Sequence, residues 1–257
     1  MTKSLFREIF PKKKSIIGMI HVFEGELDRQ IDQALEDAER LEQGGVNGLL
    51  VENYGFGYAD PNLATSDVLD RLITIMKKVK KYSRVPIGAN VLPNDYWAAF
   101  HATHLSGGSF IQMDHITGNF DSCRSVHPKD CLKIKKEYGE IAVFGGIHPK
   151  YYQLVNPACS LAECAKKAML LADGVVVTGK STGDAVSIDD LRTVFKAIGS
   201  HPIIIGSGLN SKNAREQLSH ADGAIVGTAF KKGGVHRGVP VDVGLISQLM
   251  DEVERLR

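Results

Sequence analysis

Eight alternations of a short apolar segment with a helix-like segment run through the 257-residue chain. This alternation predicts an α/β fold, a single-domain (β/α)8 TIM barrel in which helical crossovers join eight parallel strands. The apolar segments are near-continuous runs, which is typical of parallel strands buried on both faces. The length suits one barrel of about 250 residues. We therefore expect one domain over residues 1–257, with residues 1–14 as a lead-in.

Strands are expected where β-branched and other apolar residues cluster between turn signals. In chain order they cover residues 15–22, 47–51, 85–92, 110–113, 141–147, 173–177, 202–205 and 223–226. The alternative is a doubly wound open sheet, which should carry a GxGxxG motif after an early strand. No such motif follows an early strand here, and the barrel is therefore favoured.

Helical periodicity fills the intervals between these strands. The clearest helix covers 27–43, with apolar or small residues at helical spacing up to Leu41 and a stop at Gly44-Gly45. Ser66 is expected to cap the next helix. The remaining helices are expected to start at Asn94 or Asp95 and at His127-Pro128, to cover 160–171 and 188–198, to start again near Asn210, and to close the chain over 242–256.

Three strand entrances resemble one another and support repetition of one structural unit. Asn47-Gly48, Asp173-Gly174 and Asp222-Gly223 each follow a small apolar residue and lead into a buried strand. We interpret each as a short turn that feeds a strand.

The composition excludes several classes of protein. A formal net charge of +1 offers no basic excess for nucleic acid, and no run of about 18 apolar residues is present to span a membrane. The basic N-terminus lacks a long apolar stretch, so we expect no signal peptide and a cytoplasmic location. Lys12-Lys13-Lys14 is interpreted as a solvated lead-in. The four cysteines form no CxxC pair, and we expect reduced thiols rather than a disulfide or a zinc site.

The last two predicted strands each end at glycine followed by a hydroxyl residue. Glycine allows backbone N–H groups to approach an anion, and a helix N-terminus adds partial positive charge. In barrels of this kind, the loops after strands seven and eight form a phosphate site. The predicted phosphate-binding residues are Gly206, Ser207, Gly208, Gly227 and Thr228. The alternative is that these glycines only form tight turns.

Other polar residues follow the earlier strands, and the carboxyl ends of all eight strands meet on one face. As catalytic candidates we take Glu52, His148, His21 and Asp114, since carboxyl and imidazole groups transfer protons when burial tunes their pKa values. The substrate-binding candidates are Asn53, Asn90, Lys150, Thr178 and Lys180. A capping carboxylate and hydrogen-bonded core histidines are the alternatives. Neither lysine clearly lies within a strand, which argues against Schiff-base chemistry.

Two further patterns are weighed and set aside. Gly174 to Ser181 matches the P-loop pattern GxxxxGK[ST], but its middle residues read as a buried strand, so residues 178–184 are interpreted as a loop over the barrel mouth. Glu52, Asp114, His21 and His148 could together hold a divalent metal. No HxH, HExxH or paired-cysteine spacing supports that reading, and no cofactor or metal site is predicted.

Taken together, the strand-end motifs resemble the BtpA/SgcQ family over nearly the whole chain. The motifs are Gly18-Met19-Ile20-His21, Val51-Glu52-Asn53, Asn90-Val91-Leu92 with Asn94-Asp95, Thr117-Gly118, His148 with Lys150, Val177-Thr178-Gly179 through Thr182-Gly183, Gly206-Ser207-Gly208, and Ala221 through Thr228. The resemblance implies a TIM barrel. The name of the family comes from a member linked to photosystem I accumulation, and other members look like enzymes of carbohydrate metabolism.

The chain departs from the family pattern in three places. Val22-Phe23-Glu24-Gly25 replaces a Pro-rich loop, Gln112-Met113-Asp114 replaces an Arg-Val-Asn-like run, and Gly146 stands where an Asp is common. The first two departures affect substrate contacts, and the third removes an acid.

These observations lead to a functional expectation with alternatives. We expect a barrel that binds a phosphorylated small molecule, such as a sugar phosphate, and transfers protons next to a carbonyl or hemiacetal as isomerases, epimerases and lyases do. A homo-oligomer is possible. The alternatives are a non-catalytic assembly factor and a metal-dependent hydrolase.

Overall fold

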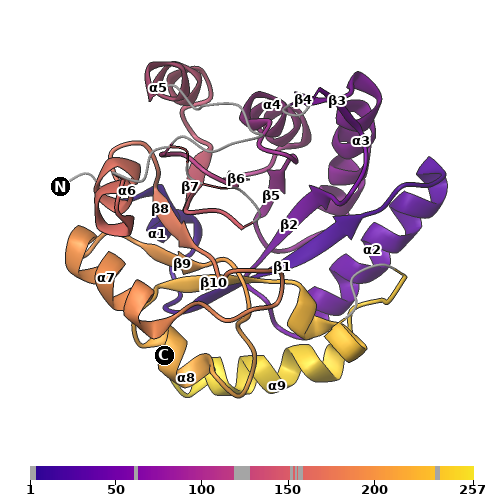
Figure 1. Cartoon of the computed structure of the whole chain (residues 1–257). Coiled ribbons are helices and arrows are strands. Elements are labelled where there is room, and N and C mark those ends of the chain that lie inside the picture. The colour runs from indigo at the N-terminus through magenta and orange to yellow at the C-terminus, as the bar shows by residue number, and fades with distance from the viewer. Residues whose placement is uncertain are drawn as a thin grey trace.

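Eight parallel strands close into a barrel in the order β1-β10-β9-β8-β7-β6-β5-β2, and helices surround it (Figure 1). The computed structural model describes residues 4–60, 63–118, 128–150, 153, 155, 159–234 and 238–257. The barrel strands are β1 (Ser15–Val22), β2 (Gly48–Asn53), β5 (Ile87–Asn90), β6 (Phe110–Met113), β7 (Ala142–Ile147), β8 (Gly174–Val177), β9 (Ile203–Ile205) and β10 (Gly223–Val226). The predicted (β/α)8 barrel is confirmed.

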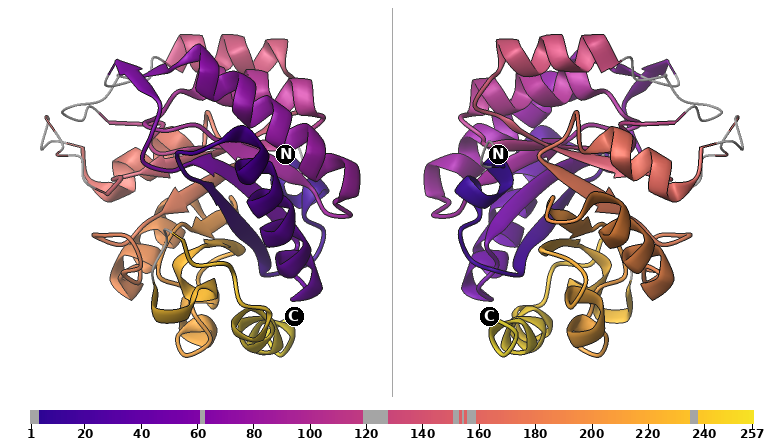
Figure 2. Two further views of the ribbon diagram at one scale, coloured as in Figure 1. Left: turned by 90° about the vertical axis from the view of Figure 1, so that its right-hand side faces the viewer. Right: turned by 90° about the vertical axis from the view of Figure 1, so that its left-hand side faces the viewer.

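The helices cover the outside of the barrel, as the two further views in Figure 2 show. They are α1 (Leu5–Ile9), α2 (Leu27–Gln43), α3 (Ser66–Tyr82), α4 (Tyr96–Ser106), α5 (Pro128–Glu137), α6 (Leu161–Ala168), α7 (Ile188–Ile198), α8 (Ala214–Leu218) and α9 (Val243–Glu254), with short 3-10 turns η1 (Thr228–Phe230) and η2 (Lys232–Gly234). A small antiparallel pair, β3 (Tyr58–Asp60) and β4 (Leu63–Ala64), lies in the loop after β2.

Most element bounds agree with the sequence, and the differences have local causes. Thr65 rather than Ser66 caps α3, because its side chain accepts a hydrogen bond from the Val68 amide. The helix after β9 begins at Ala214 instead of near Asn210. The Asn210 Oδ1 atom accepts from the backbone amides of Lys212 and Asn213, so residues 210–213 form a side-chain-stabilised turn.

The three similar strand entrances share one hydrogen-bond pattern. Asn47, Asp173 and Asp222 each donate a backbone N–H, at 2.7 Å, to a carbonyl of the neighbouring strand. Each side chain then accepts from the backbone N–H of that same strand residue: Ile16, Val143 and Ile203. The short polar side chain thus fixes the register between two parallel strands where the chain enters the barrel.

Helix α1 occupies the N-terminal end of the barrel, a feature the sequence did not predict. Phe10 packs edge-on against Phe110 with ring centroids 5.5 Å apart, and Phe6 packs in the same way against Phe144. A Cβ atom on Gly48 would lie only 2.8 Å from the Phe10 ring, so glycine at the start of β2 admits that ring. The aromatic cluster therefore closes this end of the barrel.

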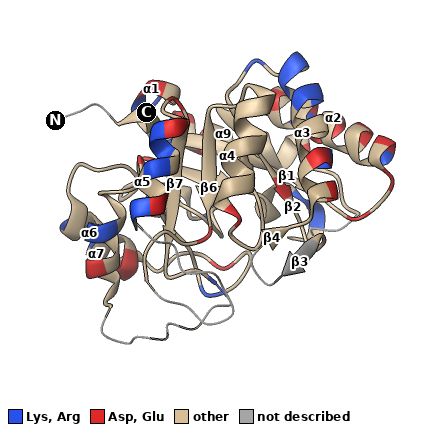
Figure 3. Cartoon of the chain, turned by 90° about the horizontal axis from the view of Figure 1, so that it is seen from above, with Lys and Arg blue, Asp and Glu red and all other residues tan. Residues whose placement is uncertain are grey.

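Charged side chains of both signs lie on the outer helices, whereas α4 carries no Lys, Arg, Asp or Glu (Figure 3). This mixing agrees with the near-neutral net charge. Among the described residues, no helix is both long and apolar enough to cross a membrane.

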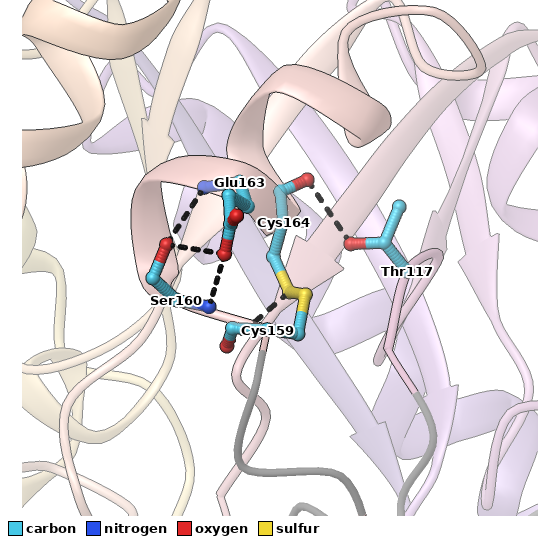
Figure 4. Close-up of a disulfide and its surroundings, with 5 residues drawn as sticks. All are labelled: Thr117, Cys159, Ser160, Glu163 and Cys164. Atoms are coloured by element: carbon cyan, nitrogen blue, oxygen red, sulfur yellow. Dashed lines mark hydrogen bonds between the residues drawn. A yellow bond between two sulfur atoms is a disulfide. The ribbon is translucent and has the colours of Figure 1, made fainter.

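One cysteine expectation is wrong, because Cys159 and Cys164 form a disulfide with their Cα atoms 6.1 Å apart (Figure 4). Ser160 caps α6 through a reciprocal bond pattern with Glu163, and this turn brings the two cysteines together. The Thr117 hydroxyl donates to the Cys164 carbonyl at 3.1 Å and ties the bridge to the loop after β6. Cys131 is a buried free thiol, and Cys123 lies outside the described residues.

Candidate functional site

A cavity of about 340 Å³ opens at the carboxyl ends of the strands. Polar groups from almost every strand end reach it, as parallel strands require. Its walls include most of the predicted site residues: His21, Glu52, Asp114, Lys150, Thr178, Gly206, Ser207, Gly208, Gly227 and Thr228. Residues that lie far apart in the sequence therefore form one site.

Strand register explains why polar groups gather on one side of this cavity. Residues paired across parallel strands point to the same face, and His21, Glu52, Asn90 and Gln112 are successive partners across β1, β2, β5 and β6. On the opposite side, Gly206 after β9 and Gly227 after β10 line the cavity. A Cβ on Gly206 would lie 2.6 Å from Val176, and one on Gly227 would lie 2.7 Å from the His21 ring. The site therefore has a polar wall and an open glycine wall.

Glu52 and Asp114 form a carboxylate pair held by one amide. The Asn90 Nδ2 atom donates to Glu52 Oε2 at 2.7 Å and to Asp114 Oδ1 at 3.3 Å. Burial, and then the negative charge of Asp114, raises the pKa of Glu52 to about 8, although the Asn90 hydrogen bond and the Lys150 charge oppose this. Burial also raises the pKa of Asp114, against the same two opposing influences.

His21 lies against this pair on the neighbouring strand. Its Nε2 atom is 3.8 Å from Glu52 Oε1, and the side chain is buried. The Tyr54 ring packs edge-on against the imidazole at a centroid distance of 5.0 Å. His21 is thus placed to contact a group that is bound beside Glu52.

The predicted phosphate site is a turn fastened to the loop after β8. The Ser207 Oγ atom accepts from the Gly179 amide at 2.7 Å and donates to the Asp184 carbonyl at 3.0 Å. Gly208 has a φ of +70°, and a Cβ there would lie 2.3 Å from backbone atoms of that loop. This packing requires glycine at position 208 whether or not a ligand binds, which agrees with the alternative interpretation as a tight turn.

The same turn leaves backbone donors at the cavity wall. Ser207, Gly208 and Leu209 line the cavity, and within the described part of the chain their backbone N–H groups donate no hydrogen bond. The adjacent turn η1 begins at Thr228. Because α8 starts only at Ala214, the expected contribution of a helix N-terminus directly after Gly208 is not present.

Four predicted residues do not line the cavity. Asn53 is fully buried and bonds the backbone of Leu92 and Phe56, which makes it a loop anchor. Asn90 is buried and hydrogen-bonds the carboxyl groups of Glu52 and Asp114, which do line the cavity. His148 has a φ of 49°, and its carbonyl accepts from the Thr178 hydroxyl at 3.5 Å. Lys180 is exposed outside the cavity.

Further residues line the cavity that were not among the named site candidates, including Tyr54, Gln112, Thr182 and Leu209. Gln112 had a usable signal, because it precedes Asp114 by two positions and strand side chains alternate. The P-loop-like segment is strand β8 followed by a loop, as interpreted. In the described ranges, no group of three or more His, Cys, Asp or Glu side chains is arranged to hold a metal.

The fold and cavity define the class of protein: a (β/α)8 barrel with a cavity at the C-terminal ends of its strands and a carboxylate pair in the wall of that cavity. The model of the BtpA family matches residues 12–255, and the chain belongs to that family. An uncharacterized protein of Pyrococcus furiosus is 32% identical over 235 residues, covering 86% of this chain and 88% of the relative. The photosystem I biogenesis protein BtpA of Synechocystis is 25% identical over 260 residues, covering 95% and 91%.

Solved structures share the barrel at low sequence identity. The tryptophan synthase alpha chain of Legionella pneumophila has a TM-score of 0.65 and 14% identity, covering 99% of this chain and 97% of that one. N-(5'-phosphoribosyl)anthranilate isomerase of Pyrococcus furiosus has a TM-score of 0.57 and 16% identity, covering 94% and 99%. These similarities show the fold alone.

Proposed function

We propose that this protein is an enzyme that binds a phosphorylated small molecule, such as a sugar phosphate, and transfers protons next to its carbonyl group. The observation that carries the proposal is the Asn90-bridged carboxylate pair in the wall of a cavity that also presents free backbone donors. Reactions of isomerase, epimerase or lyase type need an acid and a base in one site, and two neighbouring carboxyl groups can supply both.

The two carboxyl groups take different roles. Glu52, with its pKa raised to about 8, holds a proton at neutral pH and is the general acid. Burial raises the pKa of Asp114, whereas the Asn90 hydrogen bond and the Lys150 charge favour its ionised form, the form that acts as a base. Asp114 would take the proton from the carbon beside a carbonyl while Glu52 gives its proton to the carbonyl oxygen, producing an enediol. Asp114 would then give its proton to the former carbonyl carbon, while Glu52 takes the hydroxyl proton from the neighbouring oxygen. A carbonyl forms there, both carboxyl groups return to their starting states, and the isomerisation is complete.

The phosphate of the ligand would occupy the glycine wall. Backbone N–H groups at Ser207, Gly208 and Leu209 suit an anion, because they donate without a bulky side chain. The name of one structural neighbour, a phosphoribosylanthranilate isomerase, is consistent with this class of ligand. We assign no resident cofactor; elemental analysis of protein purified without chelator tests that assignment.

Substitution of Thr228 tests the anion site with inorganic phosphate as the probe. Thr228 lines the cavity beside Gly227, where Thr228→Asp would place a negative charge and Thr228→Asn would place a neutral group of the same size. Isothermal titration calorimetry should show phosphate binding that Thr228→Asp weakens by about tenfold or more and Thr228→Asn largely preserves. Equal binding by the two variants would refute the site.

Proton transfer is tested separately in deuterated water. Sugar phosphates of three to six carbons are incubated with the protein, and deuterium entering a C–H position is followed by NMR. We expect exchange in at least one compound and its loss in Glu52→Gln. A panel without any enzyme-dependent exchange would contradict the catalytic half of the proposal.

A non-catalytic assembly factor is the second candidate, and the name of the Synechocystis relative favours it. That role predicts a blocked barrel mouth and an exposed apolar patch. The open cavity favours the enzyme, whereas Trp97 and Leu105 expose apolar surface on the uncharged helix α4. Mass spectrometry of small molecules that co-purify with the protein separates the two, since only the ligand-binding reading expects a phosphorylated compound.

A further inference from the structure

Gln112 presents an amide that the protein itself does not use. Its Oε1 atom is buried without a hydrogen-bond partner, and neither end of the amide bonds to any described residue. The side chain is only partly buried and lines the cavity. Because Gln112 points into the barrel, the exposed remainder of the side chain, including Nε2, faces the cavity.

The position of Gln112 relates it to the carboxylate pair. It is the register partner of Asn90 on the adjacent strand, so the two backbones are about 4.8 Å apart. Asp114 follows two residues later and lines the same cavity. A ligand that contacts both Glu52 and Asp114 would therefore lie close to the Gln112 amide.

A structural role does not account for this residue. Met19, Val176 and Ile225 line the same cavity with apolar side chains, and an apolar side chain at 112 would avoid the unpaired Oε1 atom. A buried polar atom without a partner costs stability, so such an atom calls for an explanation in function.

We propose that Gln112 is a specificity-determining residue whose Nε2 donates a hydrogen bond to a carbonyl or hydroxyl oxygen of the ligand beside the carboxylate pair. The inference rests on the proposed function and deepens it, because it selects phosphorylated compounds with an oxygenated carbon chain over the phosphate group alone. A site that hydrogen-bonds an oxygen discriminates against ligands that lack it.

The test compares two probes, inorganic phosphate and ribose 5-phosphate, by isothermal titration calorimetry. The wild-type protein should bind ribose 5-phosphate more tightly than phosphate. Gln112→Met, which nearly preserves the side-chain shape, should lower the affinity for ribose 5-phosphate about fivefold to tenfold and leave that for phosphate unchanged. Gln248→Met, at an exposed position of α9, is the matched control and should change neither affinity.

The ligand-free melting temperature gives a readout that does not depend on the probes. Gln112→Met should melt at or above the wild-type temperature, because it removes an unpaired buried atom. A lower melting temperature, equal loss of affinity for both probes, or an unchanged affinity for ribose 5-phosphate would each overturn the role of Gln112. If the wild type binds phosphate but prefers it to ribose 5-phosphate, this inference fails and the anion site stands. If the wild type binds neither probe, the proposed function fails as well.

Discussion

At the scale of single residues, Glu52 shows how one side chain acquires a chemical role from its surroundings. The sequence offers a glutamate after a strand, which has an ordinary pKa of 4.5. Burial and the neighbouring Asp114 raise that pKa to about 8, and Asn90 holds the carboxylate in place. Neither Asp114 nor Asn90 is close to Glu52 in the sequence, and burial depends on the closed barrel.

The raised pKa makes a prediction about stability. The folded protein keeps a proton on Glu52 between pH 4.5 and 8, whereas the unfolded chain releases it, so this residue lowers stability as the pH rises through that window. Glu52→Gln removes the effect. Its free energy of unfolding relative to wild type should increase by about 2 kcal/mol between pH 5 and pH 7.

Urea denaturation of both proteins at the two pH values measures this difference. Glu39→Gln, at an exposed position of α2, serves as the control and should show a nearly constant difference. A constant difference for Glu52→Gln as well would mean that Glu52 ionises normally in the folded protein.

At the scale of elements, the loop after β8 depends on a serine that belongs to a different strand end. Ser207 holds both ends of this loop, through the Gly179 amide and the Asp184 carbonyl. The sequence predicted that this hydroxyl contacts a phosphate, and the structure shows that it fastens the loop after β8. The proposed phosphate site and the loop are therefore joined by hydrogen bonds.

Ser207→Ala is expected to loosen this loop while the barrel stays folded. Removing two hydrogen bonds of a buried hydroxyl should lower the free energy of unfolding by about 1 to 3 kcal/mol. Trypsin should cleave after the exposed Lys180 faster than in wild type. Ser200→Ala, at an exposed position, is the control; cleavage at the same rate in both variants would show that Ser207 does not restrain the loop.

The turns at the strand entrances were predictable from the sequence, whereas their hydrogen-bond partners were not. The repeated Asn-Gly or Asp-Gly pattern was visible in the sequence, and it marked real turns. The partner strand of each side chain was not visible, since Asn47 bonds Ile16 and Asp222 bonds Ile203 across gaps of 31 and 19 residues.

At the scale of the whole molecule, the two ends of the barrel are specialised differently. The N-terminal end is filled by Phe6 and Phe10 of α1 against Phe110 and Phe144, whereas the C-terminal end holds the cavity. Aromatic side chains pack the N-terminal end, whereas the C-terminal end has a cavity with the carboxyl groups of Glu52 and Asp114 in its wall. The helix that does this is contributed by residues expected to be only a lead-in.

Phe10→Ala should therefore destabilise the entire barrel. The ring is 3% exposed and contacts both interior phenylalanines. Its removal leaves a cavity in the barrel floor and should cost about 3 to 5 kcal/mol. Thermal and urea denaturation measure the loss. Phe195→Ala, at a side chain 52% exposed on α7, should cost far less. Similar costs for the two would show that α1 does not seal the barrel.

The sequence by itself determined the fold class, the order of the strands and the face on which the site lies, because hydrophobic periodicity and turn residues are local properties. It also placed Glu52, Asp114 and the glycine turns on the face where the cavity lies, since residues at the carboxyl ends of parallel barrel strands converge there. The tertiary structure alone decided that Asn90 joins two carboxyl groups, that Asn53 anchors a loop, and that Gln112 lines the cavity. It also paired Cys159 with Cys164. These outcomes depend on cross-strand register and on burial, which only the closed barrel sets.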